Sequence, residues 1–211
     1  MSKNTFMLKN VQCVYPTLSD ASAYKEGDKK KYSITLLIPK DDKEQLPAFT
    51  KWIKDCVAGT TWKKETKTHV TKTALDYEKG FNKYCILKDG DIINEKRVED
   101  EKGSKDFNQG VIVIKPSKDE DRGRPVVVDQ KKNVISVAEI AGKITSGDYV
   151  NVQVYGSCYD FQGSKGFAVK LNAVQKVKDG EDLTAHNPFE ELEIEEVEEG
   201  VGTEEGSNPF A

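Results

Sequence analysis

Apolar and polar side chains alternate in two segments near the start of the chain, Phe6 to Tyr15 and Tyr32 to Ile38. Successive side chains of a β-strand point to opposite faces, so this period of two is typical of strands. In the second segment, Ile34 and Leu36 fall on one face, while Leu37 falls on the other. The pattern predicts two strands, each with a buried face.

After the second strand the apolar spacing becomes helical, because Leu46, Phe49 and Ile53 recur at intervals of three to four residues. An interior proline would break such a helix, so Pro47 predicts that the regular helix begins near that residue. Gly59 is a suitable stop. The sequence therefore predicts one main helix directly after the second strand.

The stretch from Thr60 to Asp106 has no regular period, although Lys88 to Asp91 reads as a hairpin turn containing Asp-Gly. A short apolar segment, Val134 to Ile144, predicts a short helix. Alternation then returns in four further segments. They are 111–115, 125–129, 149–155 and 166–177. About five or six strands with one main helix predict a mainly β fold, a small closed or partly open β-barrel.

The charge is divided unevenly along the 211 residues. Residues 1–180 hold 32 Lys and Arg against 25 Asp and Glu, whereas residues 181–211 hold eleven acids and no Lys or Arg. The formal net charge of -4 therefore combines a body of +7 with a segment of -11. We expect one folded domain over 1–180 and a disordered acidic tail over 181–211, because the tail has too few apolar residues to fold alone.

The tail contains the tripeptide Asn-Pro-Phe twice, at 187–189 and at 208–210. An aromatic ring can fill a pocket on a partner protein while neighbouring carboxylates meet a basic rim. The repeat thus favours a peptide ligand over a purely solubilising tail. The candidate partner-binding residues are Phe189, Asn208, Pro209 and Phe210.

Nothing in the sequence assembles a catalytic site. It has no phosphate-binding Gly-rich motif and no G-x-S-x-G, and its only histidines are His69 and His186. The four cysteines form no C-x-x-C pair, so no metal site and no cofactor are expected. We also expect no signal peptide and no membrane span, and hence a cytoplasmic protein that is monomeric or weakly oligomeric.

Lysines and aromatic residues are interleaved between Thr60 and Lys88. This mixture is typical of surfaces that bind single-stranded nucleic acid, because cations neutralise phosphates and flat rings stack on unpaired bases. Further lysines, arginines and aromatics lie on the polar loops and on the polar faces of the predicted strands. The candidate DNA-binding residues are Lys29, Lys30, Lys31, Trp62, Lys63, Lys64, Lys67, Lys72, Tyr77, Phe81, Lys83, Tyr84, Lys88, Lys115, Arg122, Arg124, Tyr149, Tyr155, Tyr159, Phe161 and Lys170.

Several short motifs, in their order along the body, carry a resemblance to a known family. They are KNV at 9–11, YPTL at 15–18, KYSITLLIPK at 31–40, KDGD at 88–91, GDYVNV at 147–152 and GFAVKLNAVQ at 166–175. With them, the chain resembles bacteriophage single-stranded DNA-binding proteins, which have an OB fold and an acidic, Phe-containing C-terminal tail.

The resemblance implies a non-enzymatic protein that coats single-stranded DNA during phage replication, recombination or repair in the bacterial host cell. It also implies that the tail competes with DNA for the binding groove and recruits phage or host replication proteins, such as a polymerase, a helicase or a nuclease. Two alternatives remain open. The body could be an RNA-binding OB-type module, or a β-barrel in a phage assembly or adaptor protein whose tail docks a partner.

Overall fold

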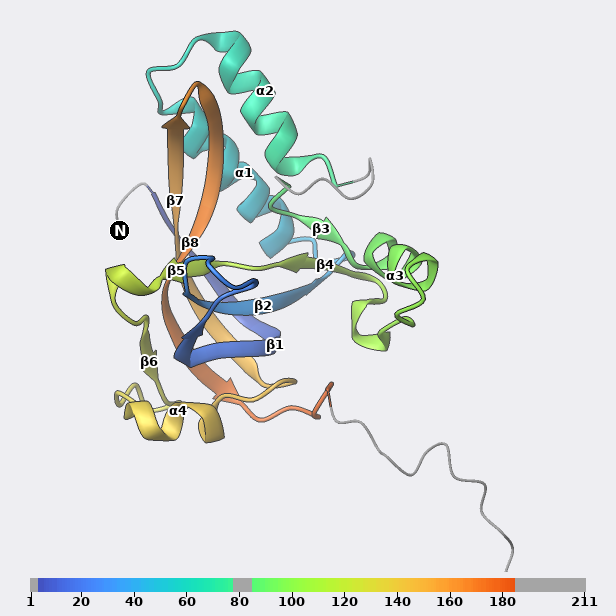
Figure 1. Cartoon of the computed structure of the whole chain (residues 1–211), viewed down its shortest axis with the longest axis vertical. Helices are drawn as coiled ribbons and strands as arrows, with labels where there is room; N and C mark the ends of the chain where they lie inside the picture. Colours follow the sequence, from blue (N-terminus) through green and yellow to red (C-terminus); the bar gives the residue numbers. More distant parts are fainter. Residues whose placement is uncertain (1–3, 78–84, 185–211) are drawn as a thin grey trace, which may run out of the picture.

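The structure is a computed structural model, and it describes residues 4–77 and 85–184 (Figure 1). The strands are β1 (Thr5–Ser22), β2 (Lys31–Pro39), β3 (Lys88–Asp89), β4 (Val111–Ile114), β5 (Ser117–Asp119), β6 (Val126–Val128), β7 (Tyr149–Phe161) and β8 (Ser164–Lys178). The helices are α1 (Gln45–Ala58), α2 (Lys64–Leu75), α3 (Gly90–Glu99) and α4 (Val137–Lys143), with 3-10 turns η1 (Asp106–Asn108) and η2 (Glu120–Arg122).

The strand pairings run around a ring, from β1 to β2, β5, β8, β7 and back to β1. All of these pairs are antiparallel except β5 with β8, which meet through the single parallel pair Ser117 and Lys170. Strand β4 lies end to end with β5 along β2, and the carbonyl of Pro116 between them accepts from the Ile34 N–H at 3.4 Å. This arrangement is that of a small, partly open barrel of the OB type.

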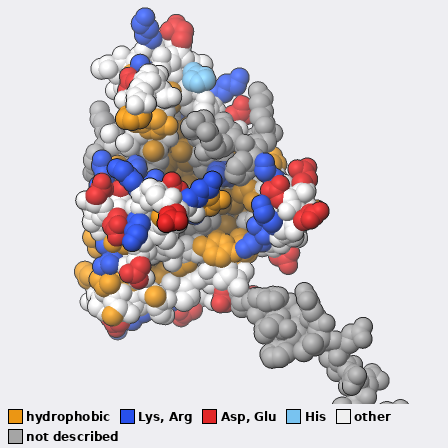
Figure 2. Space-filling model, in the orientation of Figure 1, with side chains coloured by type: hydrophobic (Ala, Val, Ile, Leu, Met, Phe, Trp, Pro, Cys, Tyr) orange, Lys and Arg blue, Asp and Glu red, His pale blue; other side chains and the backbone are white. Residues whose placement is uncertain are grey.

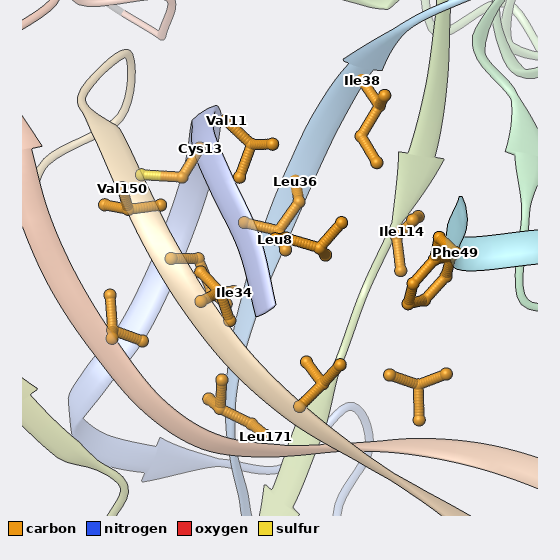
Figure 3. Packing of buried hydrophobic residues seen from close by; sticks show 14 of the residues in the cluster. Leu8, Val11, Cys13, Ile34, Leu36, Ile38, Phe49, Ile114, Val150 and Leu171 are labelled. Atoms are coloured by element: carbon orange, nitrogen blue, oxygen red, sulfur yellow. The ribbon is translucent and has the colours of Figure 1, made fainter. Parts of the chain in front are cut away.

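The main core fills the inside of this ring. Leu8 of β1, Ile34 and Leu36 of β2, Val150 of β7 and Leu171 of β8 are all fully buried, and Figure 3 shows that they point toward one another. The alternating residues of β2 and β7 are predicted to form a buried face, and they do, because every second side chain of each strand enters the same apolar interior.

Helix α1 packs across one end of the ring through an aromatic cluster. The Phe49 ring centroid lies 5.2 Å from those of Phe6 and Trp52, and Trp52 lies 5.9 Å from Phe167 of β8. The helix begins at Gln45, so Pro47 lies in its first turn, where its missing N–H has no intrahelical partner to lose. Helix α4 packs on β1 at the opposite end (Figure 1).

The predicted fold class is confirmed, while the details add elements that the sequence did not indicate. Within the described residues there are eight strands rather than five or six: β6 falls inside the predicted segment 125–129, and the additional strands are β3 and β5, with two and three residues. The irregular stretch contains α2 and α3, and the short helix expected within 134–144 is α4. A period cannot be recognised in strands of two or three residues.

The prediction of a hairpin turn at 88–91 is wrong. Lys88 and Asp89 form β3, and α3 begins at Gly90. The Asp89 carboxylate accepts from the N–H groups of Asp91 and Ile92, so this aspartate caps a helix instead of opening a tight turn. A methyl group at Gly90 would overlap the backbone of Asn108, and this close packing explains the glycine.

Candidate nucleic-acid interface

Three hollows on one side of the body share residues, and together they define what we name the basic groove. The first, of about 600 Å³, is lined by Ser22, Ala23, Tyr24, Asp28, Lys29, Lys31, Ser33, Lys115 and Ser117. The second, of about 320 Å³, is lined by Cys85, Ile86, Lys88, Ile114, Lys115, Ser117, Tyr159, Phe167, Ala168 and Val169. The third, of about 150 Å³, is lined by His69, Val70, Thr73, Ala74, Tyr159, Ser164, Lys165, Gly166 and Phe167.

The shared residues make the groove continuous. Lys115 and Ser117 line both the first and the second hollow, and Tyr159 and Phe167 line both the second and the third. The groove therefore runs from the β1–β2 loop, across β4, β5 and β8, to the β7–β8 hairpin and α2. On the face shown in Figure 2, Lys and Arg side chains form a band across the middle of the body, with acidic side chains among them.

Two lysines face the middle of the groove from neighbouring strands. Lys88 comes from β3 and is half-buried, whereas Lys115 follows β4 and is exposed. Burial lowers the pKa of Lys88; the Cys85 thiol offsets part of this, and the charge of Lys115 adds to it. An anion bound between the two lysines would relieve their repulsion, so this part of the groove is suited to a phosphate.

Asp119 of β5 forms ion pairs with two further lysines, Lys31 of β2 and Lys170 of β8. Its carboxylate lies 3.7 Å from Lys31 Nζ and 3.3 Å from Lys170 Nζ. Burial opposes the charge of Asp119, but the hydrogen bond and charge of Lys170, together with Lys31, lower its pKa below the ordinary value. Lys170 is thus held by an acid beside Ser117, its partner across the sheet, while Lys31 and Ser117 line the first hollow.

Tyr159 supplies an exposed ring at the junction of the second and third hollows. It is paired with Gly166 across the β7–β8 hairpin, and its side chain is 38% exposed. A methyl group at Gly166 would overlap this ring, so the glycine allows the ring to lie against the opposite strand. A ring fixed in this way has little conformational freedom to lose when a base stacks on it.

The predicted DNA-binding residues divide into several groups. Five of them line the basic groove, namely Lys29, Lys31, Lys88, Lys115 and Tyr159. Lys30 is exposed beside the first hollow, and the exposed ring of Phe161 lies near the tip of the β7–β8 hairpin. On α2 and just before it, Lys63, Lys64 and Lys72 are exposed, while Lys67 donates to the Ala58 carbonyl at 2.8 Å.

Other predicted residues serve the fold in this structure. Trp62 and Tyr77 pack against the main core, so neither ring lies in the groove. Arg124 lies 5.4 Å from the Tyr32 ring centroid and donates to the Ser19 carbonyl at 2.6 Å. Tyr149 is covered by Lys178, whose Nζ is 4.2 Å from the ring centroid.

Two more predicted residues lie on the body's surface, and the rest lie outside the described residues. Tyr155 is partly buried beside Lys170 on the paired strands, and Arg122 is exposed in η2. The predicted residues Phe81, Lys83 and Tyr84, and the tail residues Phe189, Asn208, Pro209 and Phe210, are outside the described residues.

The groove also contains residues that the sequence analysis missed. Tyr24 in the β1–β2 loop is 91% exposed, and it is the one aromatic among charged and small neighbours there, a signal that could have been used. Lys165 sits at the hairpin, where it pairs with Asp160 at 3.0 Å. Phe167 reads as an ordinary core position and is 5% exposed, so nothing in the sequence marks it.

The described residues were also searched for metal ligands and membrane-spanning helices. No group of three or more His, Cys, Asp or Glu that could hold a metal ion occurs among them. None of the helices in residues 4–77 and 85–184 is long and apolar enough to cross a membrane.

The family comparison and the structure comparison both match this chain to the same phage protein. The family model described as "Enterobacter phage Enc34, ssDNA-binding protein" matches residues 4–201. The solved structure of the single-stranded DNA-binding protein from bacteriophage Enc34 in complex with ssDNA is 25% identical, with a TM-score of 0.61, over 86% of this chain and 90% of that chain. A C-terminal truncation of that phage protein is 26% identical, with a TM-score of 0.60, over 86% and 89%. A search of curated proteins found no match.

Proposed function

The chain belongs to the phage Enc34 ssDNA-binding protein family, and from this premise we propose that it binds single-stranded DNA in the basic groove without catalysing a reaction. The lysines of the groove would neutralise phosphates and release their counterions, and the exposed rings would stack on bases. Both interactions are possible with any base sequence, so the binding is sequence-independent.

One observation of the structure supports this proposal most strongly, the continuity of the groove. A single strand needs a track several nucleotides long, and the three hollows connect through shared residues from Lys29 to Lys165. Cations occur along this track at Lys31, Lys115 and Lys88, and Tyr159 lies beyond them. The lysines could contact successive phosphates of an extended strand while the ring of Tyr159 stacks on one of its bases.

We propose that the acidic tail acts on the same groove and on other proteins. A segment of net -11 tethered to a body of +7 is a polyanion at high local concentration, so it competes with DNA for the lysines. Displacement by DNA then frees Phe210 for a replication protein. In this function the protein serves phage DNA replication, recombination or repair in the host cell, as a monomer or weak oligomer.

The binding test is a fluorescence anisotropy titration with a labelled oligonucleotide. Intrinsic fluorescence is a poor reporter, because Trp52 is 7% exposed and Trp62 packs against the core, both outside the groove. We expect tight binding to oligo-dT, weaker binding to duplex DNA, and a steep loss of affinity with salt. Equal or tighter binding to a matched oligo-rU would favour the RNA-binding alternative, and no binding to any of them would favour the adaptor alternative.

Recruitment needs a separate test. The full chain and its Phe210→Ala variant would be immobilised and exposed to purified phage or host polymerase, helicase and nuclease, with and without oligo-dT. The proposal predicts retention of at least one of these proteins by the unmodified chain, enhanced by oligo-dT and lost in the variant. Retention that is indifferent to Phe210 would refute the assigned role of this residue.

A further inference from the structure

A second site with aromatic and basic side chains lies where the described chain ends, next to the basic groove, because Val113 beneath it is paired with Lys88 of the groove. We name it the tail-root patch, and it consists of Tyr15, Lys105, Phe107 and Leu183. The rings of Tyr15 and Phe107 meet edge to face with centroids 6.0 Å apart. Phe107 and Leu183 pack against the buried residues Val14, Leu37 and Val113, a small apolar cluster separate from the main core.

The first residues of the acidic segment are held against the body at this place. A methyl group at Gly147 would overlap the Glu181 carbonyl, and one at Gly180 would overlap the Gly147 carbonyl, so the two backbones are in close contact. The Gly180 N–H also donates to the carboxylate of Asp148 at 3.3 Å. Leu183 is therefore positioned by the fold, and the tail starts beside the patch.

The patch offers a cation and an exposed ring. Lys105 Nζ donates to the Tyr15 hydroxyl and lies 4.6 Å and 5.4 Å from the ring centroids of Tyr15 and Phe107. In the part of the chain that the structure describes, no carboxylate lies within ion-pair distance of Lys105. Tyr15 remains 42% exposed. The patch thus presents an exposed ring on which another ring can pack and a charge that can meet a carboxylate.

We propose that the first Asn-Pro-Phe of the acidic segment docks in cis on the tail-root patch, with Phe189 against Tyr15 and Phe107 and with Glu190 or Glu191 near Lys105. Five residues lie between Leu183 and Phe189, and the six residue steps span up to about 20 Å when extended. The connection is long enough to fold back onto a patch that includes Leu183. The sequence also supplies the carboxylates directly after the ring.

This docking gives the two copies of Asn-Pro-Phe different roles. The first copy anchors the tail to the body, and the second, at 208–210, remains available to the groove or to a partner. The anchor also fixes where the free part of the tail begins, close to residue 190. The inference goes beyond the proposed function and does not depend on DNA binding.

Amide hydrogen exchange of the full chain, without DNA, tests the docking. We expect amides of residues 187–191 to exchange about tenfold more slowly, relative to their intrinsic rates, than those of 205–210. Phe189→Ala should abolish this protection, whereas the matched control Phe210→Ala should leave it unchanged. Lys105→Glu should also abolish it, with a cooperative unfolding transition and a Tm lowered by only a few degrees showing that the body remains folded.

Three outcomes would overturn the inference. Equal exchange of the two segments in the unmodified chain would exclude docking. Protection that survives Phe189→Ala, or that is lost in Phe210→Ala, would assign the contact to other residues. Protection that increases with protein concentration would assign the patch to the tail of a second copy.

Discussion

The basic groove and the tail-root patch are both built from lysines and aromatic rings, but the two regions arrange them differently. In the groove, Lys88 and Lys115 face the same hollow, and the charge of Lys115 lowers the pKa of Lys88. In the patch, Lys105 lies over the rings of Tyr15 and Phe107. Like charges facing each other favour an anion from outside, whereas a lysine over ring faces is already partly satisfied within the fold.

This difference shows why composition alone does not identify a nucleic-acid surface. Lysines and aromatics interleaved in sequence between 60 and 88 predict one binding surface, yet Trp62 and Tyr77 pack against the core. What distinguishes the groove is that its cations line three adjoining hollows that share residues.

The largest expected effect comes from removing the two lysines that face each other. Lys88→Ala with Lys115→Ala should weaken oligo-dT binding on the order of 50-fold at low salt, because each lost phosphate contact removes counterion release. The slope of log affinity against log salt should become shallower by about 1.4. The matched control is Lys54→Ala with Lys131→Ala, two exposed lysines outside the groove with the same change in charge. Equal losses in the two variants would show that only net charge matters.

The next largest loss of affinity is expected from removing Tyr159, the exposed ring in the groove. Tyr159→Ala should weaken binding about tenfold through the loss of base stacking, and Tyr159→Phe, which keeps the ring, should be nearly neutral. Gly166→Ala leaves the tyrosine in place but forces its ring to move, so affinity should also fall. Anisotropy titrations of the three variants would be compared, and a neutral Tyr159→Ala would remove this ring from the binding site.

Removing the acidic tail should have a smaller effect on DNA affinity, and it should raise the affinity instead of lowering it. Truncation after Thr184 keeps Leu183 on the body and removes nine of the eleven acids. Affinity for oligo-dT should rise about fivefold at low salt and by less at high salt, where the tail's charge is screened. If the truncated chain bound no more tightly than the full chain at low salt, the tail would not be a competitor for the groove.

A further prediction concerns pH and the lowered pKa of Lys88. A phosphate favours the charged ammonium, so DNA binding should raise this pKa from its low value in the free protein. Affinity should therefore be greatest where Lys88 is protonated in the free protein, and it should decline by a few-fold as the pH rises through that pKa. Lys88→Arg, which stays charged, should bind with less pH dependence in the same range. An identical pH profile for both proteins would contradict the assignment.

Much of the fold could be predicted from the sequence, for a physical reason. Strand β7 buries every second side chain, and Ile34, Leu36 and Ile38 of β2 enter the main core in the same way, so the alternation is visible in the residues themselves. Short strands are different, because β3 and β5 are defined by their neighbours, and Asp89 acts as a helix cap only in the presence of α3. The ring of pairings also depends on Ser117 meeting Lys170, a contact between residues far apart in sequence.

The candidate site could be predicted less completely. Lys29, Lys31, Lys88, Lys115 and Tyr159 were identified from residue type and were placed in one groove by the fold. Trp62 and Arg124 have equally suitable chemistry but contact the core and the Tyr32 ring. Whether a ring faces a groove or a core depends on packing between segments distant in sequence, and a local pattern does not contain that information.

The smallest expected effect on DNA affinity comes from Lys105, the lysine of the tail-root patch. Lys105→Ala should change oligo-dT affinity by less than about twofold, while lowering the free energy of unfolding by about 0.5 to 1 kcal/mol through the loss of its contacts with Tyr15 and Phe107. Lys115→Ala should show the reverse, a clear loss of affinity with little change in stability, because Lys115 is exposed. Urea unfolding and anisotropy titration of both variants measure the two quantities. If Lys105→Ala weakened binding as much as Lys115→Ala does, the strand would extend over both regions, and the lysine over the rings would be part of the DNA-binding surface.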